Sequence, residues 1–244
     1  MRSGGGILNT IYSTLNTILD ILFPPLCLGC RTYLAEKAKA DLLCQNCFSK
    51  IPLYQTIFRT MPTGRQANEG LPLFAVTPYE DKIARELIHY FKYKSFLAAR
   101  NPLQELIFKY LNLFKIKLEK TVAVPIPLHK KRFRERGFNQ SEILAEIVGE
   151  YFNLPIETEL LTKNKKTKDQ IKMKDYDERR KNIKGGFVLN IERLKYLKAA
   201  GIEKIILVDD VYTSGATIEE AAKLFRRAGF KNINIFVFAK AGYG

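Results

Sequence analysis

The run IILVDDVYTSGAT, residues 205–217, sets the architecture of the chain. Its four consecutive aliphatic residues, 205–208, predict a fully buried strand at the centre of a sheet. Two adjacent carboxylates follow that strand, and a hydroxyl- and glycine-rich turn then leads into a helix predicted over Thr217–Ala228. In parallel α/β sheets, ligands bind beyond the carboxyl ends of the strands, so this strand–turn–helix unit marks the first candidate site.

The residue types in this run suit a sugar phosphate. Backbone N–H groups of the turn and the start of the helix form a nest for a phosphate dianion. The carboxylates of Asp209 and Asp210 can accept hydrogen bonds from two vicinal hydroxyls of a pentose. Ser and Thr also favour ordinary helix starts, but two adjacent acids after a buried strand require a ligand or solvent. The candidate phosphate-binding residues are Thr213, Ser214, Gly215, Ala216 and Thr217.

Strand and helix signals alternate from Leu73 to the end of the chain, which predicts a mostly parallel sheet with helices on both faces. The expected strands are 73–77, 121–125, 159–161, 187–189, 205–208 and 233–238, and the expected helices are 81–94, 102–117, 141–152, 191–199 and 217–228. We expect residues 1–58 to form an N-terminal helix and a cysteine module, 59–72 a linker, and 73–244 the α/β domain.

All four cysteines of the chain lie in two C-x-x-C pairs, Cys27/Cys30 and Cys44/Cys47, separated by thirteen residues. Two such pairs complete a tetrahedral sulfur shell, so they predict a structural zinc site with no open position for catalysis. A redox pair or an iron–sulfur centre is the alternative interpretation. We expect the metal to hold together a module too small for a core of its own.

The N-terminal region carries apolar residues at helical spacing from Ile7 to Leu22, ended by Pro24-Pro25. Residues 3–26 contain no Lys or Arg, so packing on its own domain is favoured over binding to an anionic membrane. No secretory signal pattern and no apolar stretch long enough for a bilayer span is present, which predicts a cytoplasmic protein that is at most peripheral to the membrane.

Forty basic residues against 25 acidic residues give a net charge of +15, and the surplus is concentrated in two segments. Residues 130–136 hold five basic residues and one acid, and residues 163–184 hold ten basic residues and four acids. Cations interleaved with aromatic side chains are typical of single-stranded nucleic-acid binding, although a solvated basic loop is the alternative. The candidate contacts are Lys131, Arg132, Arg134, Arg136, Phe138, Asn139, Gln140, Lys172, Arg179 and Arg180.

The run at 205–217 resembles the fingerprint of the type I phosphoribosyltransferases, which bind phosphoribosyl pyrophosphate (PRPP). Nearly the whole chain resembles, more narrowly, the ComF family of competence proteins. The motifs that carry this second resemblance are the cysteine pairs after Phe23-Pro24-Pro25, the run VPIP at 124–127, RFRERGFNQ at 132–140, Tyr79 with Lys92-Tyr93, and Gln170 with Met173, Arg179 or Arg180, Asn182 and Phe187.

The resemblance implies a PRPP site in which Asp209 and Asp210 hold the ribose and act at the reacting carbon. It also implies that Leu128, His129 and Lys130 take the pyrophosphate together with Mg²⁺, although His129 is equally well interpreted as an exposed loop histidine. The family acts in natural transformation, so the implied partners are single-stranded DNA and a ComFA-like helicase at the inner face of the membrane.

Two other interpretations remain open at this point. An active phosphoribosyltransferase would transfer the sugar to a small-molecule acceptor, and a PRPP sensor would bind the ligand without catalysis. The sequence does not name the acceptor. Amidophosphoribosyl transfer is disfavoured because it needs a glutaminase domain with a processed N-terminal cysteine, whereas Cys27 lies in the cysteine module.

Overall fold

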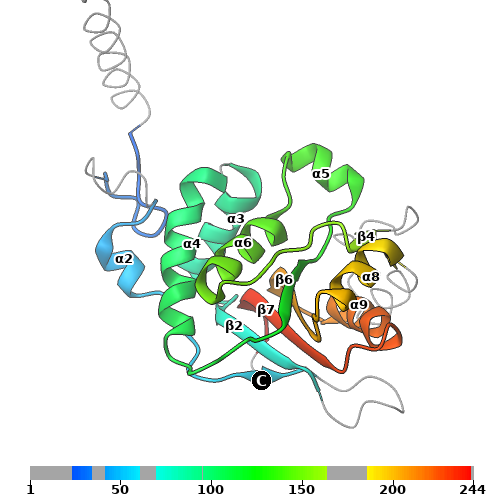
Figure 1. Cartoon of the computed structure of the whole chain (residues 1–244). Helices are drawn as coiled ribbons and strands as arrows, with labels where there is room; N and C mark the ends of the chain where they lie inside the picture. Colours follow the sequence, from blue (N-terminus) through cyan, green and yellow to red (C-terminus); the bar gives the residue numbers. More distant parts are fainter. Residues whose placement is uncertain (1–23, 35–41, 61–69, 95, 164–185, 243–244) are drawn as a thin grey trace, which may run out of the picture.

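A computed structural model describes residues 24–34, 42–60, 70–94, 96–163 and 186–242. Its centre is a five-stranded sheet with the order β1-β2-β7-β6-β3 (Figure 1). The strands are β1 (Phe58–Arg59), β2 (Pro72–Pro78), β3 (Thr121–Pro125), β6 (Lys204–Tyr212) and β7 (Asn232–Lys240). Only β1 is antiparallel to its neighbour, so the mostly parallel sheet expected from the sequence is confirmed. A separate antiparallel pair consists of β4 (Leu161–Lys163) and β5 (Phe187–Leu189).

Helices cover both faces of the sheet, as predicted. One face carries α3 (Lys82–Tyr93), α4 (Phe96–Leu111) and α6 (Gln140–Phe152), and the other carries α8 (Ile191–Ala199) and α9 (Ala216–Arg227). Two short helices complete the described elements: α2 (Gln45–Ser49) beside α4, and α5 (Lys130–Arg136) at the edge of the molecule (Figure 1).

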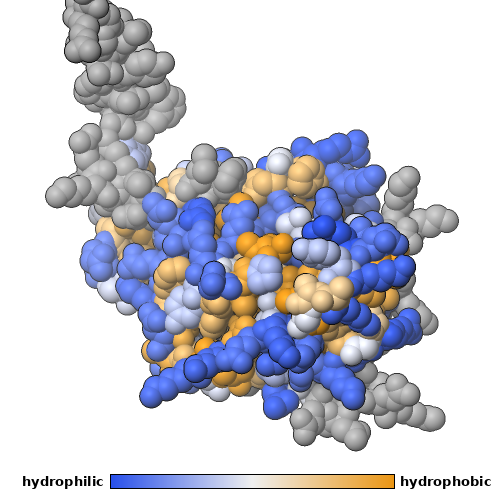
Figure 2. Space-filling model, in the orientation of Figure 1, coloured by the Kyte–Doolittle hydropathy of each residue, from blue (hydrophilic) through white to orange (hydrophobic). Residues whose placement is uncertain are grey.

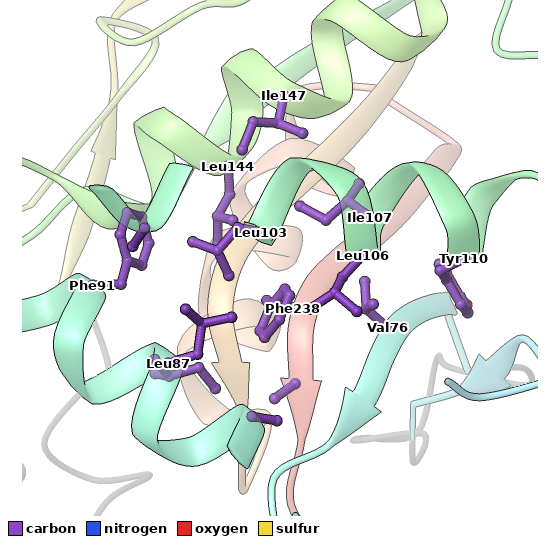
Figure 3. Packing of buried hydrophobic residues seen from close by; sticks show 14 of the residues in the cluster. Val76, Leu87, Phe91, Leu103, Leu106, Ile107, Tyr110, Leu144, Ile147 and Phe238 are labelled. Carbon is purple, nitrogen blue, oxygen red and sulfur yellow. The ribbon is translucent and has the colours of Figure 1, made fainter. Parts of the chain in front are cut away.

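Alternate residues of the central strands pack into two separate hydrophobic cores, one on each face of the sheet. In β6, Ile206 and Val208 belong to the cluster under α3, α4 and α6, whereas Ile205 and Leu207 belong to the cluster under α8 and α9. Because side chains alternate across a strand, a four-aliphatic run is needed to bury both faces of a central strand. Figure 3 shows Leu87, Leu103, Leu144 and Phe238 converging from three helices and the sheet in the first cluster.

The cysteine module packs on the first of these cores. Its buried residues Leu34, Leu43 and Phe48 belong to the same cluster as the residues of α3 and α4. The ends of the predicted linker 59–72 are also ordered by pairing, since Arg59 in β1 lies opposite Pro72 in β2. The apolar side chains of the module thus gain burial by sharing the core of the α/β body.

Several element boundaries differ from the sequence-based expectation. Helix α4 begins six residues before Pro102, which was expected to start the helix, so the proline lies inside it. Strand β4 begins at Leu161, where the expected strand 159–161 ends. The basic segment 130–136, for which no helix was expected, folds into α5. The helix is capped by Gly137, which has a left-handed φ of 79°.

Candidate functional site

The acid pair lies within strand β6, because this strand continues past the predicted end at Val208 to Tyr212. Strand β7 accompanies it along this extension, with Tyr212 opposite Lys240. On the other side, the β3 ladder stops where Pro125 lies opposite Val208. Asp209 and Asp210 therefore extend beyond the carboxyl end of β3, at the edge of the sheet where parallel α/β proteins bind ligands.

Hydrogen bonds fix the first carboxylate of the pair. One oxygen of Asp209, Oδ1, accepts from the hydroxyl of Ser141 at 3.0 Å and from the backbone N–H of Asp210 at 2.9 Å. The pKa of Asp209 is raised from 3.8 to about 7, first by burial and second by the adjacent charge of Asp210. The two hydrogen bonds and Lys92 oppose this rise.

Two basic residues from distant segments, Lys92 and Lys163, act on the pair, and a third, Arg132, acts on Lys163. Lys92 of α3 places its Nζ atom 2.8 Å from Oδ2 of Asp210, and both side chains are less than one-fifth exposed. Burial lowers the pKa of Lys163 in β4, the charge of nearby Arg132 in α5 lowers it further, and Asp209 acts in the opposite direction. The site thus combines two acids with three cations, an arrangement that accommodates a ligand bearing both hydroxyl and phosphate groups.

A turn follows β6, as predicted, and α9 begins directly after this turn, at Ala216. Gly215 precedes the helix with a left-handed φ of 72° and supplies no side-chain cap. The N–H of Ala216 reaches Oγ of Ser214 at only 3.5 Å, the limit of a hydrogen bond. The first turn of α9 therefore presents N–H groups that a bound anion would satisfy.

Tyr212 limits the space at this turn. A Cβ atom added to Gly215 would lie 2.3 Å from the Tyr212 hydroxyl, so this position accepts glycine alone. Thr213 is exposed, and Ser214 and Thr217 are partly exposed, so these three hydroxyl side chains remain accessible around the turn.

The loop after β3 brings the predicted pyrophosphate residues to the same end of the sheet. His129 caps α5, because its Nδ1 atom accepts from the N–H of Lys131 at 3.3 Å. Leu128 and Lys130 line a cavity of about 490 Å³. The Nδ1 atom of His129 thus has a structural role, and Nε2 is the ring nitrogen that is left to bind a ligand.

The predicted nucleic-acid residues divide into exposed and buried groups. Lys131 and Arg134 of α5 are exposed, and Figure 2 shows hydrophilic residues over much of the face that carries this helix. Asn139 and Gln140 are only 3% and 1% exposed, and Phe138 packs on Phe91 of the core with ring centroids 5.8 Å apart. These three residues position α5 and α6. Lys172, Arg179 and Arg180 lie outside the described residues.

Arg136 joins α5 to α3 and α6. It donates to Oε1 of Gln140 at 2.8 Å and to the Tyr93 hydroxyl at 3.2 Å. Within the described parts of the chain, Nε of Arg136 and Nε2 of Gln140 are buried donors without an acceptor. Buried donors are normally satisfied, so these two atoms suit a bound water or anion.

The four cysteines come together as predicted. Their Sγ atoms all lie within 4.8 Å of one another, and those of Cys30 and Cys44 are 3.7 Å apart. Backbone N–H groups of Cys44 and Cys47 donate to the sulfurs of Cys27 and Cys44 at 3.3 and 3.4 Å. Four convergent sulfurs with N–H donors fit a structural zinc ion, which would complete its tetrahedral shell with thiolates alone.

Close packing surrounds this cluster. A Cβ atom on Gly29 would lie 2.7 Å from Sγ of Cys47, so glycine is required between the first two ligands. Burial raises the pKa of the Cys47 thiol to about 12, whereas the Thr32 hydroxyl lowers that of Cys30 to about 6. A cation at the centre would therefore have to displace the proton of Cys47.

Sequence reasoning missed three residues of the site at the acid pair: Lys92, Ser141 and Lys163. Lys92 and Lys163 were noticed only as parts of motifs or charged segments, and Ser141 as the start of a helix. Their placement depends on tertiary packing, because all three are far from the acid pair in sequence. Lys92 lies 118 residues before Asp210, and Ser141 and Lys163 lie 68 and 46 residues before Asp209. No local signal marks such contacts.

No helix among the described residues has the length and apolar character that a membrane span requires. Residues 18–58 match the family model of a double zinc ribbon domain. The chain contains four cysteines in total, enough for one four-sulfur site.

Curated proteins from several bacteria are similar to the chain. Competence protein F of Haemophilus influenzae is 30% identical over 127 residues, which cover 52% of this chain and 53% of that protein. Competence protein ComFC of Bacillus subtilis is 34% identical over 111 residues, covering 44% of this chain and 39% of its relative.

DNA utilization protein YhgH of Escherichia coli O157:H7 is 26% identical over 190 residues, covering 74% and 78% of the two chains. The matched regions thus span about half or less of the two competence proteins and a larger share of YhgH. Together, these matches agree with the resemblance deduced from the motifs: the chain is similar to curated proteins named Competence protein F, Competence protein ComFC and DNA utilization protein YhgH.

Proposed function

We propose that the carboxyl end of β6 binds PRPP. In this proposal Asp209 and Asp210 accept hydrogen bonds from the ribose hydroxyls, and the turn at 213–217 holds the 5-phosphate. The observation that carries the proposal is the position of the acid pair: it extends beyond the end of β3, and the turn that follows it leads into a helix start without a side-chain cap. A pentose phosphate carries both the hydroxyls that the acids would accept from and the phosphate that the helix start would hold.

The charges around the pair support a ligand with several phosphates. Lys92, Lys163 and Arg132 supply positive charge beside the two acids. The loop residues Leu128, His129 and Lys130 would take the pyrophosphate end, because they follow the neighbouring strand at the same edge of the sheet. Mg²⁺ would arrive with the pyrophosphate, since this hard cation needs few protein ligands when phosphate oxygens are available.

A calorimetric titration tests PRPP binding. We expect zinc-loaded protein to bind PRPP with Mg²⁺, and the double variant Asp209→Asn/Asp210→Asn to lose at least tenfold in affinity. A matched control is Asp81→Asn, which changes an acid at the N-cap of α3 and should leave binding intact. Equal binding by wild type and the double variant would refute the assignment of the acids.

We further propose that the protein binds single-stranded DNA in competence and DNA uptake, beside a ComFA-like helicase at the cytoplasmic side of the membrane. The names of the relatives support this role. The exposed basic residues of α5 and the net charge of +15 supply the phosphate contacts that such binding needs. The zinc module would act structurally, by anchoring its segment to the core that it shares with α3 and α4.

Salt dependence tests the DNA role. If Lys131, Arg132 and Arg134 contact phosphates, the affinity for an oligonucleotide should fall steeply between 50 and 200 mM salt, in proportion to the number of contacts. The triple variant of these residues to Gln should bind more weakly and show a smaller slope. Weak binding with a flat salt dependence would exclude this role.

One observation favours active phosphoribosyl transfer as a second candidate. The raised pKa of Asp209, about 7, suits a general base that accepts a proton from an acceptor near neutral pH. No protein nucleophile is needed, because transfer from PRPP passes through a cationic sugar that nearby carboxylates stabilise. Pyrophosphate release that depends on one added nucleobase would support this activity, whereas its absence across a panel of bases would oppose it.

A further inference from the structure

The cavity of about 490 Å³ beside α5 is a second recess at this end of the sheet, and its size lies within the usual range for ligand sites. Three short segments contribute to it: the loop after β3, the helix α5, and the start of α6. Its lining residues are Pro127, Leu128, Lys130, Phe133, Arg134, Asn139 and Glu142. Two apolar residues, one aromatic ring, two cations and one acid thus face the same space.

Helix α5 supplies an aromatic ring flanked by two cations. Lys130, Phe133 and Arg134 are spaced i, i+3 and i+4, so they share one face of the helix. Phe133 is 47% exposed and belongs to neither hydrophobic cluster, so core packing does not account for it. Lys130 and Arg134 make no ion pair with any other residue that the structure describes.

The opposite side of the cavity carries a fixed carboxylate. Asn139 donates from Nδ2 to the Ile126 carbonyl and to Oε1 of Glu142, both at 3.1 Å. These bonds occupy the amide of Asn139 and hold the Glu142 side chain in place. Glu142 is partly buried and is the single acidic residue among those that line the cavity.

We propose that this cavity holds an unpaired base of single-stranded DNA, with a preference for cytosine or adenine over thymine. The base stacks on Phe133, and a neighbouring phosphate contacts Arg134, while Lys130 lies between the base and the proposed pyrophosphate loop. The Glu142 carboxylate accepts a hydrogen bond from the exocyclic amino group, as carboxylates do with cytosine N4. Thymine has no amino group and presents carbonyl oxygens there, which repel the carboxylate. The inference deepens the proposed DNA role and rests on it.

The cavity is connected to the acid pair through the first turn of α6. Asn139 and Glu142 line the cavity, while Ser141 of the same turn donates to Asp209. A base in the cavity would therefore lie beside the proposed pentose phosphate site. This placement allows one ligand to affect the affinity of the other.

Binding of labelled 12-residue oligonucleotides to the zinc-loaded full chain tests the proposal. We expect oligo(dC) to bind at least fivefold more tightly than oligo(dT), and Phe133→Leu to weaken oligo(dC) binding about tenfold. An abasic oligonucleotide of equal length should bind both proteins equally, because it keeps the phosphates and lacks the bases. Glu142→Gln should remove the difference between oligo(dC) and oligo(dT).

Control variants separate base recognition from general damage. Tyr196→Leu removes another exposed aromatic ring, on α8, and should leave all affinities unchanged. Free cytosine at millimolar concentration should not displace oligo(dC), because it lacks the phosphate contacts; displacement would assign the cavity to a free base and overturn the proposal.

The failures of the two proposals are distinguishable. If Phe133→Leu weakens abasic and oligo(dC) binding equally, or changes neither, the base-binding inference is wrong while the DNA role stands. If wild-type protein binds no oligonucleotide, both are wrong.

Discussion

Replacing Asp209 by Asn is expected to make the ligand-free protein more stable at pH 8. Asn is nearly isosteric and can still accept hydrogen bonds from Ser141 and from the N–H of Asp210. It cannot ionise, so it avoids burying a negative charge beside a second carboxylate. The substitution should thus stabilise the fold while it removes a group that the proposed ligand needs, as is common at functional sites.

The pKa of Asp209 sets the size and the pH range of this effect. Between about pH 4 and pH 7 the folded protein keeps a proton on Asp209 that the unfolded chain releases, so wild-type stability falls as the pH rises through this range. A rise in pKa from 3.8 to about 7 would cost at most about 4 kcal/mol at pH 8. Because the Asp209 residue is partly exposed to solvent, which lowers this cost, we expect about 1–3 kcal/mol.

Urea denaturation of the zinc-loaded protein, without PRPP or Mg²⁺, measures this difference at several pH values. The gain in the free energy of unfolding caused by Asp209→Asn should reach its full value at pH 8 and fall to about a quarter of that value near pH 4.5. Asp81→Asn, which keeps an N-cap acceptor on α3, should have a small and pH-independent effect. A variant that is less stable than wild type at pH 8, or equally shifted at both pH values, would refute the reasoning.

Three further predictions concern the metal module and an ion pair with a buried carboxylate. Gly29→Ala should weaken zinc retention at least tenfold in a chelator competition, because the added Cβ would lie 2.7 Å from Sγ of Cys47. Zinc binding at pH 7 should release at least one proton, since burial raises the pKa of Cys47 to about 12; calorimetry in buffers of different ionisation enthalpy measures this release. Arg193→Ala should lower the free energy of unfolding, because it leaves the carboxylate of Glu157, only 4% exposed, without its cation.

Each of these predictions has a contradicting result. Ser49→Ala, at an exposed position of α2, is the control for Gly29→Ala. Unchanged zinc retention in Gly29→Ala would show that the module can shift to accommodate the added methyl group. Heats independent of the buffer would show that Cys47 is already ionised. An unchanged free energy of unfolding in Arg193→Ala would show that water solvates Glu157 in the variant.

The mostly parallel sheet and most of its elements followed from local signals, because aliphatic runs and helical spacing record which faces are buried, whereas the strand order was not predicted. Strand β3, strand β5 and helix α8 have the bounds expected from the sequence. The extension of β6 was not predictable from its own residues. Asp209 and Asp210 are poor strand formers, and pairing with β7 holds this segment extended.

The site was predictable where the chemistry is contiguous along the chain, as in the acid pair, the turn and the cysteine pairs. It was not predictable where folding brings distant residues together. Lys92 reaches Asp210 from α3, and Ser141 reaches Asp209 from α6, through contacts that no spacing rule encodes. The buried state of Asn139 and Gln140 was also missed, because a basic segment next to them made them look like ligand contacts.

The central claim is that the end of β6 holds a pentose between two acids and its phosphate at the following turn. A crystal structure of the zinc-loaded protein with PRPP and Mg²⁺ tests it most directly. The account predicts ribose hydroxyls within hydrogen-bond distance of Asp209 and Asp210, and the 5-phosphate against the N–H groups of residues 213–217. PRPP bound elsewhere, or a site left without PRPP at saturating concentration, would contradict the account.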